Sequence, residues 1–190
     1  MNKKAIARIA FEFISVVFAV LLALGLNSYK QSVDAEDEAL ILKSSILKEC
    51  TENLIKIDSF RINNSEYYSY LDSLVNLGED EVDDFFFQAN IELLTNGAWT
   101  IAQNNSSINR LNQEFLIEAA EIYQTQEFYS EFSVSFFENV GNYLNRQDEV
   151  TPYTTALSLY FNMNVLNNSA EELSKQYMRF LRRYDNDSIE

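Results

Sequence analysis

The chain of 190 residues has no histidine and a single cysteine, Cys50. Without histidine, Ser-His and Cys-His nucleophile pairs are excluded, and a zinc site would need carboxylates and one thiol. The four glycines are isolated, so no glycine-rich phosphate-binding loop is present. We therefore expect no enzymatic activity, no metal site and no cofactor. Cys50 is expected to be a small buried apolar residue, or else to form a disulfide between two chains.

Glycine and proline are also scarce, with four and one in the whole chain. These residues make the tight turns of sheet proteins, so their scarcity favours a few long helices. Hydrophobic residues at 47% and aromatic residues at 14% supply a core and exclude global disorder. The sequence predicts an all-α fold.

The net charge of −15 is unevenly distributed along the chain. The first thirty residues contain four basic side chains and one acidic one, a charge of +3, so the remainder carries about −18. Such an acidic surface repels phosphate backbones and excludes nucleic acid as a partner.

An apolar run at residues 9–26, IAFEFISVVFAVLLALGL, predicts one transmembrane helix. With its flanks it gives a span at 9–29, a cytoplasmic stub at 1–8 and an extracytoplasmic antiparallel helical bundle at 30–190. Basic residues before the span favour a cytoplasmic N-terminus, hence a bacterial inner-membrane protein with a periplasmic domain. A cleaved signal peptide is the alternative, because Ala23-Leu24-Gly25 fits a cleavage site.

Glu12 lies inside this apolar run. One interpretation is a pair with Arg8, four residues earlier on the same helix. The other is a hydrogen bond to a partner helix, either a second copy or another protein, because intramembrane carboxylates are expensive and often functional.

Between residues 27 and 77 no glycine or proline occurs, and a seven-residue repeat predicts one helix that runs on from the membrane. The predicted stripe is Val33, Leu40, Leu47, Leu54, Arg61, Tyr68 and Val75. A companion position contains Cys50, Ile57 and Leu71, with Glu36, Lys43 and Asn64 as exceptions. Gly78 is expected to end the helix as a left-handed cap.

Further helices are predicted downstream. The first covers 84–95, with Asp83 or Asp84 as its cap and Gly97 closing it. A short helix at 98–102 and a polar loop at 104–107 precede a long helix at 112–145. Thr151-Pro152 predicts the start of another helix, although residues 157–165 also alternate partly as a strand would. The capping box Ser169-x-x-Glu172 predicts the start of the last helix, whose final turns hold Arg179, Arg182 and Arg183.

The only tryptophan, Trp99, is expected to anchor the core. A second interpretation groups Tyr67, Tyr68, Trp99 and Tyr123 as an aromatic cluster that holds a ligand or partner.

Three loose patterns resemble a family of small uncharacterised single-pass membrane proteins common in Bacteroidota. The first is the run 11–29, in which Glu12, Ala23, Leu24 and Asn27 match; Phe11, Ser28 and Tyr29 depart from the family's Gly, Asn and Trp. The others are Leu47-x-Glu49-x3-Asn53 and Ala98-Trp99 with Tyr123 downstream. The resemblance implies the anchor and its topology and adds no mechanism, since the family has no established activity.

Two functions follow as hypotheses. The first is a membrane-anchored structural or interaction module that binds another envelope protein or a second copy of itself. The alternative is a ligand-sensing bundle that signals through a partner membrane protein.

Overall fold

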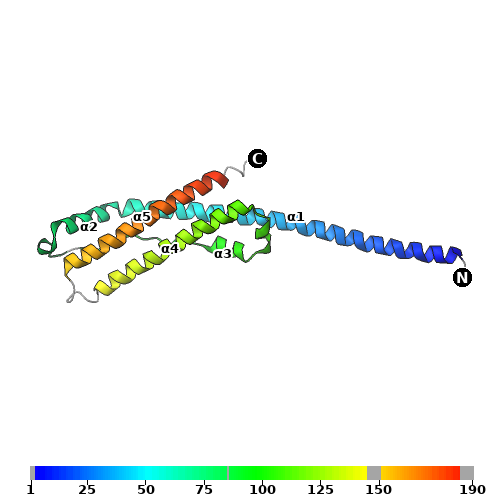
Figure 1. Ribbon diagram of the computed structural model, residues 1–190, viewed down its shortest axis with the longest axis horizontal. Helices are drawn as coiled ribbons and strands as arrows, with labels where there is room; N and C mark the ends of the chain where they lie inside the picture. The colour runs from blue at the N-terminus through cyan, green and yellow to red at the C-terminus, as the bar shows by residue number, and fades with distance from the viewer. Residues whose placement is uncertain (1–2, 85, 145–150, 185–190) are drawn as a thin grey trace.

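The computed structural model describes the backbone of residues 3–84, 86–144 and 151–184, and the side chains of 11–84, 86–142 and 151–184. Within these ranges all regular structure is helical, as predicted (Figure 1). The longer helices are α1 (Lys3–Asn63), α2 (Ser65–Leu77), α3 (Gly97–Gln103), α4 (Gln113–Leu144) and α5 (Pro152–Tyr184). The 3-10 helices are η1 (Glu79–Glu81) and η2 (Ser106–Arg110).

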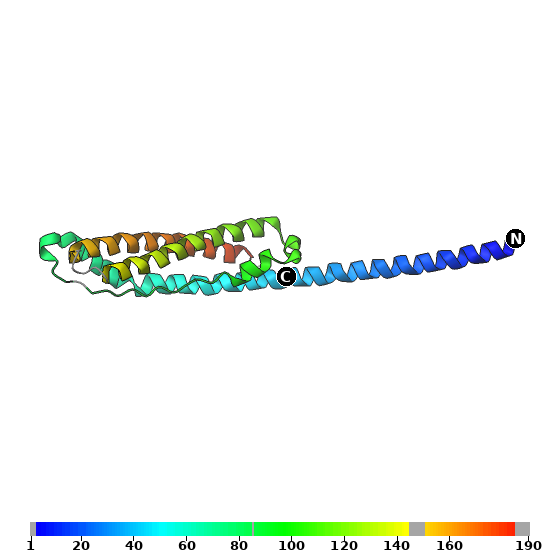
Figure 2. The same cartoon turned by 90° about the horizontal axis from the view of Figure 1, so that it is seen from below.

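Helix α1 has two parts with different surroundings. Its N-terminal part projects alone from the rest of the chain, whereas its C-terminal part packs with the other helices (Figures 1 and 2). Every side chain from 11 to 31 is exposed, although this part is apolar. Its best 18-residue window has a mean hydropathy of 2.0, and no other helix in the described ranges is long and apolar enough to cross a membrane.

The buried face of α1 and α2 is offset by one position from the predicted stripe. Buried residues recur every seven positions at Ala39, Ile46, Asn53, Phe60, Tyr67 and Leu74. Of the predicted stripe, Leu47 is buried and Leu54 and Tyr68 are half-buried against the core. Val33 and Leu40 are 40% and 59% exposed, so the stripe lies at the edge of the buried face and not at its centre. The companion position is confirmed at Cys50, Ile57 and Leu71, which are buried. Asn64, a predicted exception at this position, is buried as well.

The predicted continuous helix up to Gly78 is confirmed with one interruption at Asn64, which separates α1 from α2. Gly78 ends α2 with φ 94° and ψ 168°, an extended conformation rather than the predicted left-handed helical one. Glycine reaches this region far more readily than any residue with a side chain, so the position still requires glycine.

The predicted helix at 84–95 is wrong. Residues 86–96, which we call the strap, are neither helix nor strand and run back along α1 (Figure 2). No helix begins at Asp83 or Asp84, and Gly97 opens α3 instead of closing a helix.

Two asparagines on α1 and its end explain the extended strap. Asn64 Oδ1 accepts from Asn90 N–H at 2.8 Å, and its Nδ2 donates to Asn90 O at 2.7 Å. Asn53 makes the same pair with Thr95, at 3.0 Å and 2.7 Å. A carboxamide offers one donor group and one acceptor, so each side chain satisfies the backbone of the strap as a neighbouring strand would.

The remaining helices largely follow the predictions. The short helix at 98–102 lies within α3, and the loop predicted at 104–107 ends in η2. The long helix predicted at 112–145 is α4; residue 145 itself lies outside the described ranges. Thr151 caps α5, since its Oγ1 accepts from Thr154 N–H at 3.2 Å, and residues 157–165 are helical.

Ser169 and Glu172 do not start a helix, because α5 runs through them without a break. Met163, Leu166, Ala170 and Leu173 stay buried at helical spacing across this point, so packing continues where the sequence resembled a start.

Helix α5 packs against α1, α2 and α4. Phe115 in the first turn of α4 contacts Phe180 and Tyr184 near the end of α5, with ring centroids 5.1 Å apart in both pairs. The core therefore extends along the full length of α5.

We predict that Asn64→Ala releases the middle of the strap. The substitution leaves the backbone groups of Asn90 without their partner, at a cost of about 1–3 kcal/mol. Hydrogen exchange of the full-length protein should become faster around residue 90, and the thermal midpoint should fall. Asn63→Ala, at the exposed neighbouring position, is the matched control and should change neither; equal effects of the two variants would contradict this account.

Candidate functional site

A buried polar network joins three helices and the strap. It consists of two neighbouring hydrogen-bonded groups, which we together call the Glu49 network. The first is Glu49 on α1 with Tyr123 on α4, and the second is Asn53 on α1 with Gln126 on α4 and Tyr177 on α5. All five side chains are at most 9% exposed.

Glu49 is the hydrogen-bond acceptor of the first group. Its Oε2 accepts from the Tyr123 hydroxyl at 2.7 Å, and its two carboxylate oxygens accept from Ala98 N–H at 3.1 and 3.2 Å. Ala98 lies in the first turn of α3, where backbone N–H groups lack partners within the helix. One carboxylate thus connects α1 to both α3 and α4. Burial is the main cause that raises the pKa of Tyr123 far above its usual value, so its hydroxyl remains a donor.

Gln126 is the central residue of the second group. Its Oε1 accepts from Asn53 Nδ2 at 3.1 Å and from the Tyr177 hydroxyl at 2.6 Å, and its Nε2 donates to Thr95 O at 2.9 Å. Because Asn53 also holds Thr95, the end of the strap is fixed from α1 and α4 together. The network therefore links α1, α4, α5 and the strap in addition to their apolar packing.

Trp99 lies on the outer side of this network. Its ring stacks on Tyr123, with centroids 5.3 Å apart and planes 7° from parallel. It is half-buried and packs against the core, as expected for an anchor. It also lines a groove of about 500 Å³ between α3 and α4, which we call the Trp99 groove.

The predicted aromatic cluster is divided between three places. Trp99 and Tyr123 are together, whereas Tyr67 packs against Phe86 and Phe87. Tyr68 stacks on Tyr160 at 5.3 Å, and its hydroxyl donates to Asn164 Oδ1 at 3.1 Å. Tyr123 contacts α1 at Glu49, eighteen positions before Tyr67, which corresponds to about 27 Å along a helix.

Cys50 is fully buried, as predicted for a small apolar residue. Its Sγ lies 4.0 Å from the Tyr123 hydroxyl, and burial raises the pKa of the thiol from 9.0 to about 12. In this conformation the thiol is out of reach of a second chain.

Glu12 lies on the projecting part of α1 with an exposed side chain. The side chain of Arg8 lies outside the described residues, so the pair between Arg8 and Glu12 stays a prediction.

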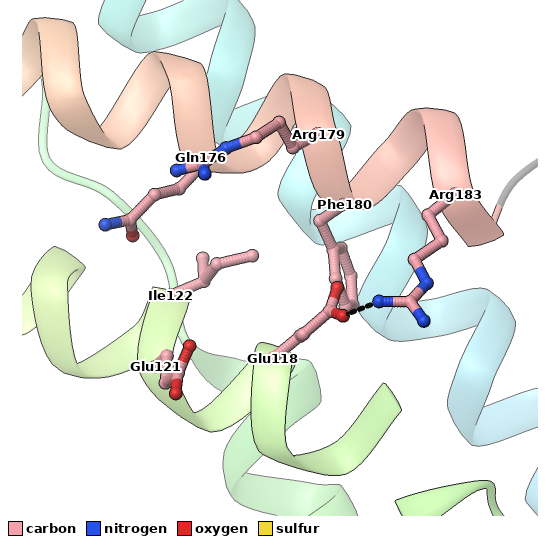
Figure 3. Close-up of a pocket in the computed structure, with 7 residues that line it drawn as sticks. All are labelled: Glu118, Glu121, Ile122, Gln176, Arg179, Phe180 and Arg183. Carbon is pink, nitrogen blue, oxygen red and sulfur yellow. Dashed lines mark hydrogen bonds and ion pairs between the residues drawn. The ribbon is translucent and has the colours of Figure 1, made fainter. Parts of the chain in front are cut away.

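A second groove lies between α4 and α5 (Figure 3). Arg183 reaches across from α5 to Glu118 on α4, and it also pairs with Glu114 at 2.7 Å. Arg179, which lines the same groove, lies 3.6 Å from Glu172 on its own helix. Arg179 and Arg183, two of the three arginines predicted to interact with the helix dipole, therefore form ion pairs, and those of Arg183 link the end of α5 to α4.

Sequence reasoning singled out Trp99 and Tyr123 but missed Gln126 and Tyr177, which show no signal beyond helical spacing. In the described residues, no group of three or more acidic or cysteine side chains is placed to hold a metal ion. Comparison with protein-family models, curated proteins and solved structures finds no match to this chain.

We predict that Cys50 resists alkylation in the folded protein at pH 8 and reacts rapidly after denaturation, because the thiolate is the nucleophile and burial suppresses its formation.

The raised pKa of Cys50 also predicts that the free energy of unfolding decreases at alkaline pH. The unfolded thiol ionises near its usual pKa while the folded one stays neutral until about 12, so stability is full below the usual pKa and falls as the pH rises between the two values.

Mass spectrometry of the labelled full-length protein measures the alkylation rate of Cys50 at each pH. The control is Ser45→Cys in a Cys50→Ser background, at an exposed position on the same helix, which should react rapidly without denaturation. If Cys50 reacts as fast as this control, the buried position is wrong.

Proposed function

We propose that this chain is a membrane-anchored structural or interaction module. In this proposal residues 1–8 are a cytoplasmic stub, 9–29 cross a bacterial inner membrane, and 30–190 form an antiparallel helical bundle in the periplasm. The module binds another envelope protein or a second copy of itself.

The observation that carries the proposal is the continuity of α1 between two environments. Its residues 11–31 are exposed and largely apolar, while the same helix from Ala39 onward contributes the buried face of the domain. Exposed apolar surface of this extent is unfavourable in water and favourable in a bilayer. The unbroken helix would then hold the domain at a fixed distance and orientation from the membrane.

Binding of a partner is supported by apolar side chains that continue beyond the apolar run. Tyr29, Val33 and Leu40, which we call the juxtamembrane stripe, lie on one side of α1 at helical spacing and are 71%, 40% and 59% exposed. The described part of this chain leaves the stripe uncovered, and adjoining apolar surface is typical of an interaction site. A second helix packed along α1 would bury it.

Glu12 supports the same location for a partner. A carboxylate within a membrane-spanning helix is costly in lipid and is stabilised by a hydrogen bond from a neighbouring helix. Glu12 and the juxtamembrane stripe lie on one helix, so a single partner helix beside α1 would reach both regions.

The topology is tested by cysteine labelling in whole cells, in a Cys50→Ser background. A membrane-impermeant maleimide should modify Asp34→Cys in intact cells, and Asn2→Cys only after the membrane is permeabilised. The opposite pattern would overturn the predicted orientation, and failure of the protein to sediment with membranes would overturn the anchor.

We predict that Glu12→Leu and Leu40→Glu each reduce the recovered complex by several fold when the full-length protein is crosslinked in cells and purified through a C-terminal tag. The first removes the hydrogen bond that we propose between Glu12 and the partner helix, and the second places a charge in the proposed apolar contact. Ile55→Glu changes an equally exposed residue of α1 within the domain and should leave the complex intact. A lone monomer from the unchanged protein, or full assembly of both variants, would refute the interaction surface.

A further inference from the structure

The Trp99 groove combines one aromatic platform with a rim of polar side chains, all of them uncharged except Glu127. Its volume is about 500 Å³, within the range of small-molecule sites. Besides Trp99, the polar side chains that line it include Asn96, Thr100, Gln103, Gln124 and Ser130. Amides and hydroxyls both donate and accept hydrogen bonds, so this rim suits a ligand that does the same.

The electrostatic character of the groove excludes two classes of ligand. Among the described residues that line it there is no Lys or Arg, and Glu127 is its one ionisable carboxylate. Anionic ligands such as phosphates would meet no basic partner and a protein of net charge −15. A purely apolar ligand would leave the amides of Gln103 and Gln124 without hydrogen bonds, which is costly on burial.

The floor of the groove is held rigidly by the Glu49 network. Tyr123 stacks under Trp99 and is fixed by its hydrogen bond to Glu49, and the same carboxylate fixes the start of α3, which carries Trp99. The amide of Gln126 is engaged with Asn53, Tyr177 and Thr95, so it supports the floor. A surface fixed before binding loses less entropy when a ligand binds.

We propose that the Trp99 groove binds a neutral saccharide of one or two sugar units. The apolar C–H face of a pyranose packs against the indole ring, and the hydroxyls around its edge match the amides and hydroxyls of the rim. This inference is independent of the proposed interaction function, because it requires neither the anchor nor the juxtamembrane stripe.

Trp99 is the only tryptophan, so the emission of the full-length protein reports on this groove directly. The protein is kept in a polyoxyethylene detergent, because a maltoside headgroup is itself a candidate ligand. The neutral probes are glucose, maltose, cellobiose, N-acetylglucosamine and its β-1,4 dimer. Glucuronate and glucose 6-phosphate, both anionic, are the charged counterparts.

A saturable change in Trp99 emission with at least one neutral probe is the expected result, with weaker binding of the charged counterparts. Gln124→Ala should weaken that binding by about fivefold, as expected for the loss of one hydrogen bond. Gln176→Ala removes an amide from the groove between α4 and α5 and should leave the affinity unchanged.

Three results would overturn the inference. They are the absence of a saturable change up to about 50 mM of every neutral probe, tighter binding of a charged counterpart than of its neutral parent, and equal affinity of Gln124→Ala and the unchanged protein. Because the partner experiments do not use this groove, none of these results bears on the interaction function.

Discussion

The fold depends on two buried carboxamides that do the work of a neighbouring strand. Asn53 and Asn64 lie on the same buried face of α1 and the turn that ends it, and each pairs with both backbone groups of one strap residue. A buried backbone N–H or C=O without a partner costs as much as a lost hydrogen bond. These side chains therefore help to hold the strap extended against the helices, together with the packing of Ala89, Ile91 and Leu94 on the core. Its route in turn brings Ala98 to Glu49 and places α3 beside α4.

This constraint explains why the face of α1 that meets the strap is partly polar. The predicted stripe and the buried face each contain one polar residue, Arg61 and Asn53 respectively, so apolar content alone does not distinguish the two positions. The true stripe includes Asn53 because Gln126 and Thr95 satisfy its amide. The result is a helix that is apolar where it projects and mixed where it packs, and this difference separates the proposed membrane segment from the domain.

Local signals predicted the elements that depend on local interactions. The Thr151 cap, the short helix around Trp99 and the long helix α4 are set by hydrogen bonds and spacings within a few residues, and each was identified. The strap was missed because its apolar residues read as a helix and its hydrogen-bond partners lie 26 and 42 positions away in the sequence. The helix start predicted at Ser169 and Glu172 is wrong because a local signal is overridden by distant contacts, since the packing of α5 continues through these residues. Of the candidate site, Trp99 and Tyr123 were identified, but their separation from Tyr67 and Tyr68 required the fold.

The two proposed sites share one physical link, which is α1. The juxtamembrane stripe lies on its exposed part, and Glu49, which fixes the floor of the Trp99 groove, lies on the same unbroken helix nine residues beyond Leu40. Nine residues of helix span about 14 Å, without a glycine or proline to absorb a displacement. A partner that shifts or rotates α1 would therefore move Glu49 and, through its hydrogen bonds, both Tyr123 and the start of α3. Linkage is reciprocal: if a partner changes the affinity for a ligand in the groove, that ligand changes the affinity for the partner by the same factor. Coupling between the sites thus requires that α1 move relative to α4, and rigid packing around the Glu49 network opposes that motion.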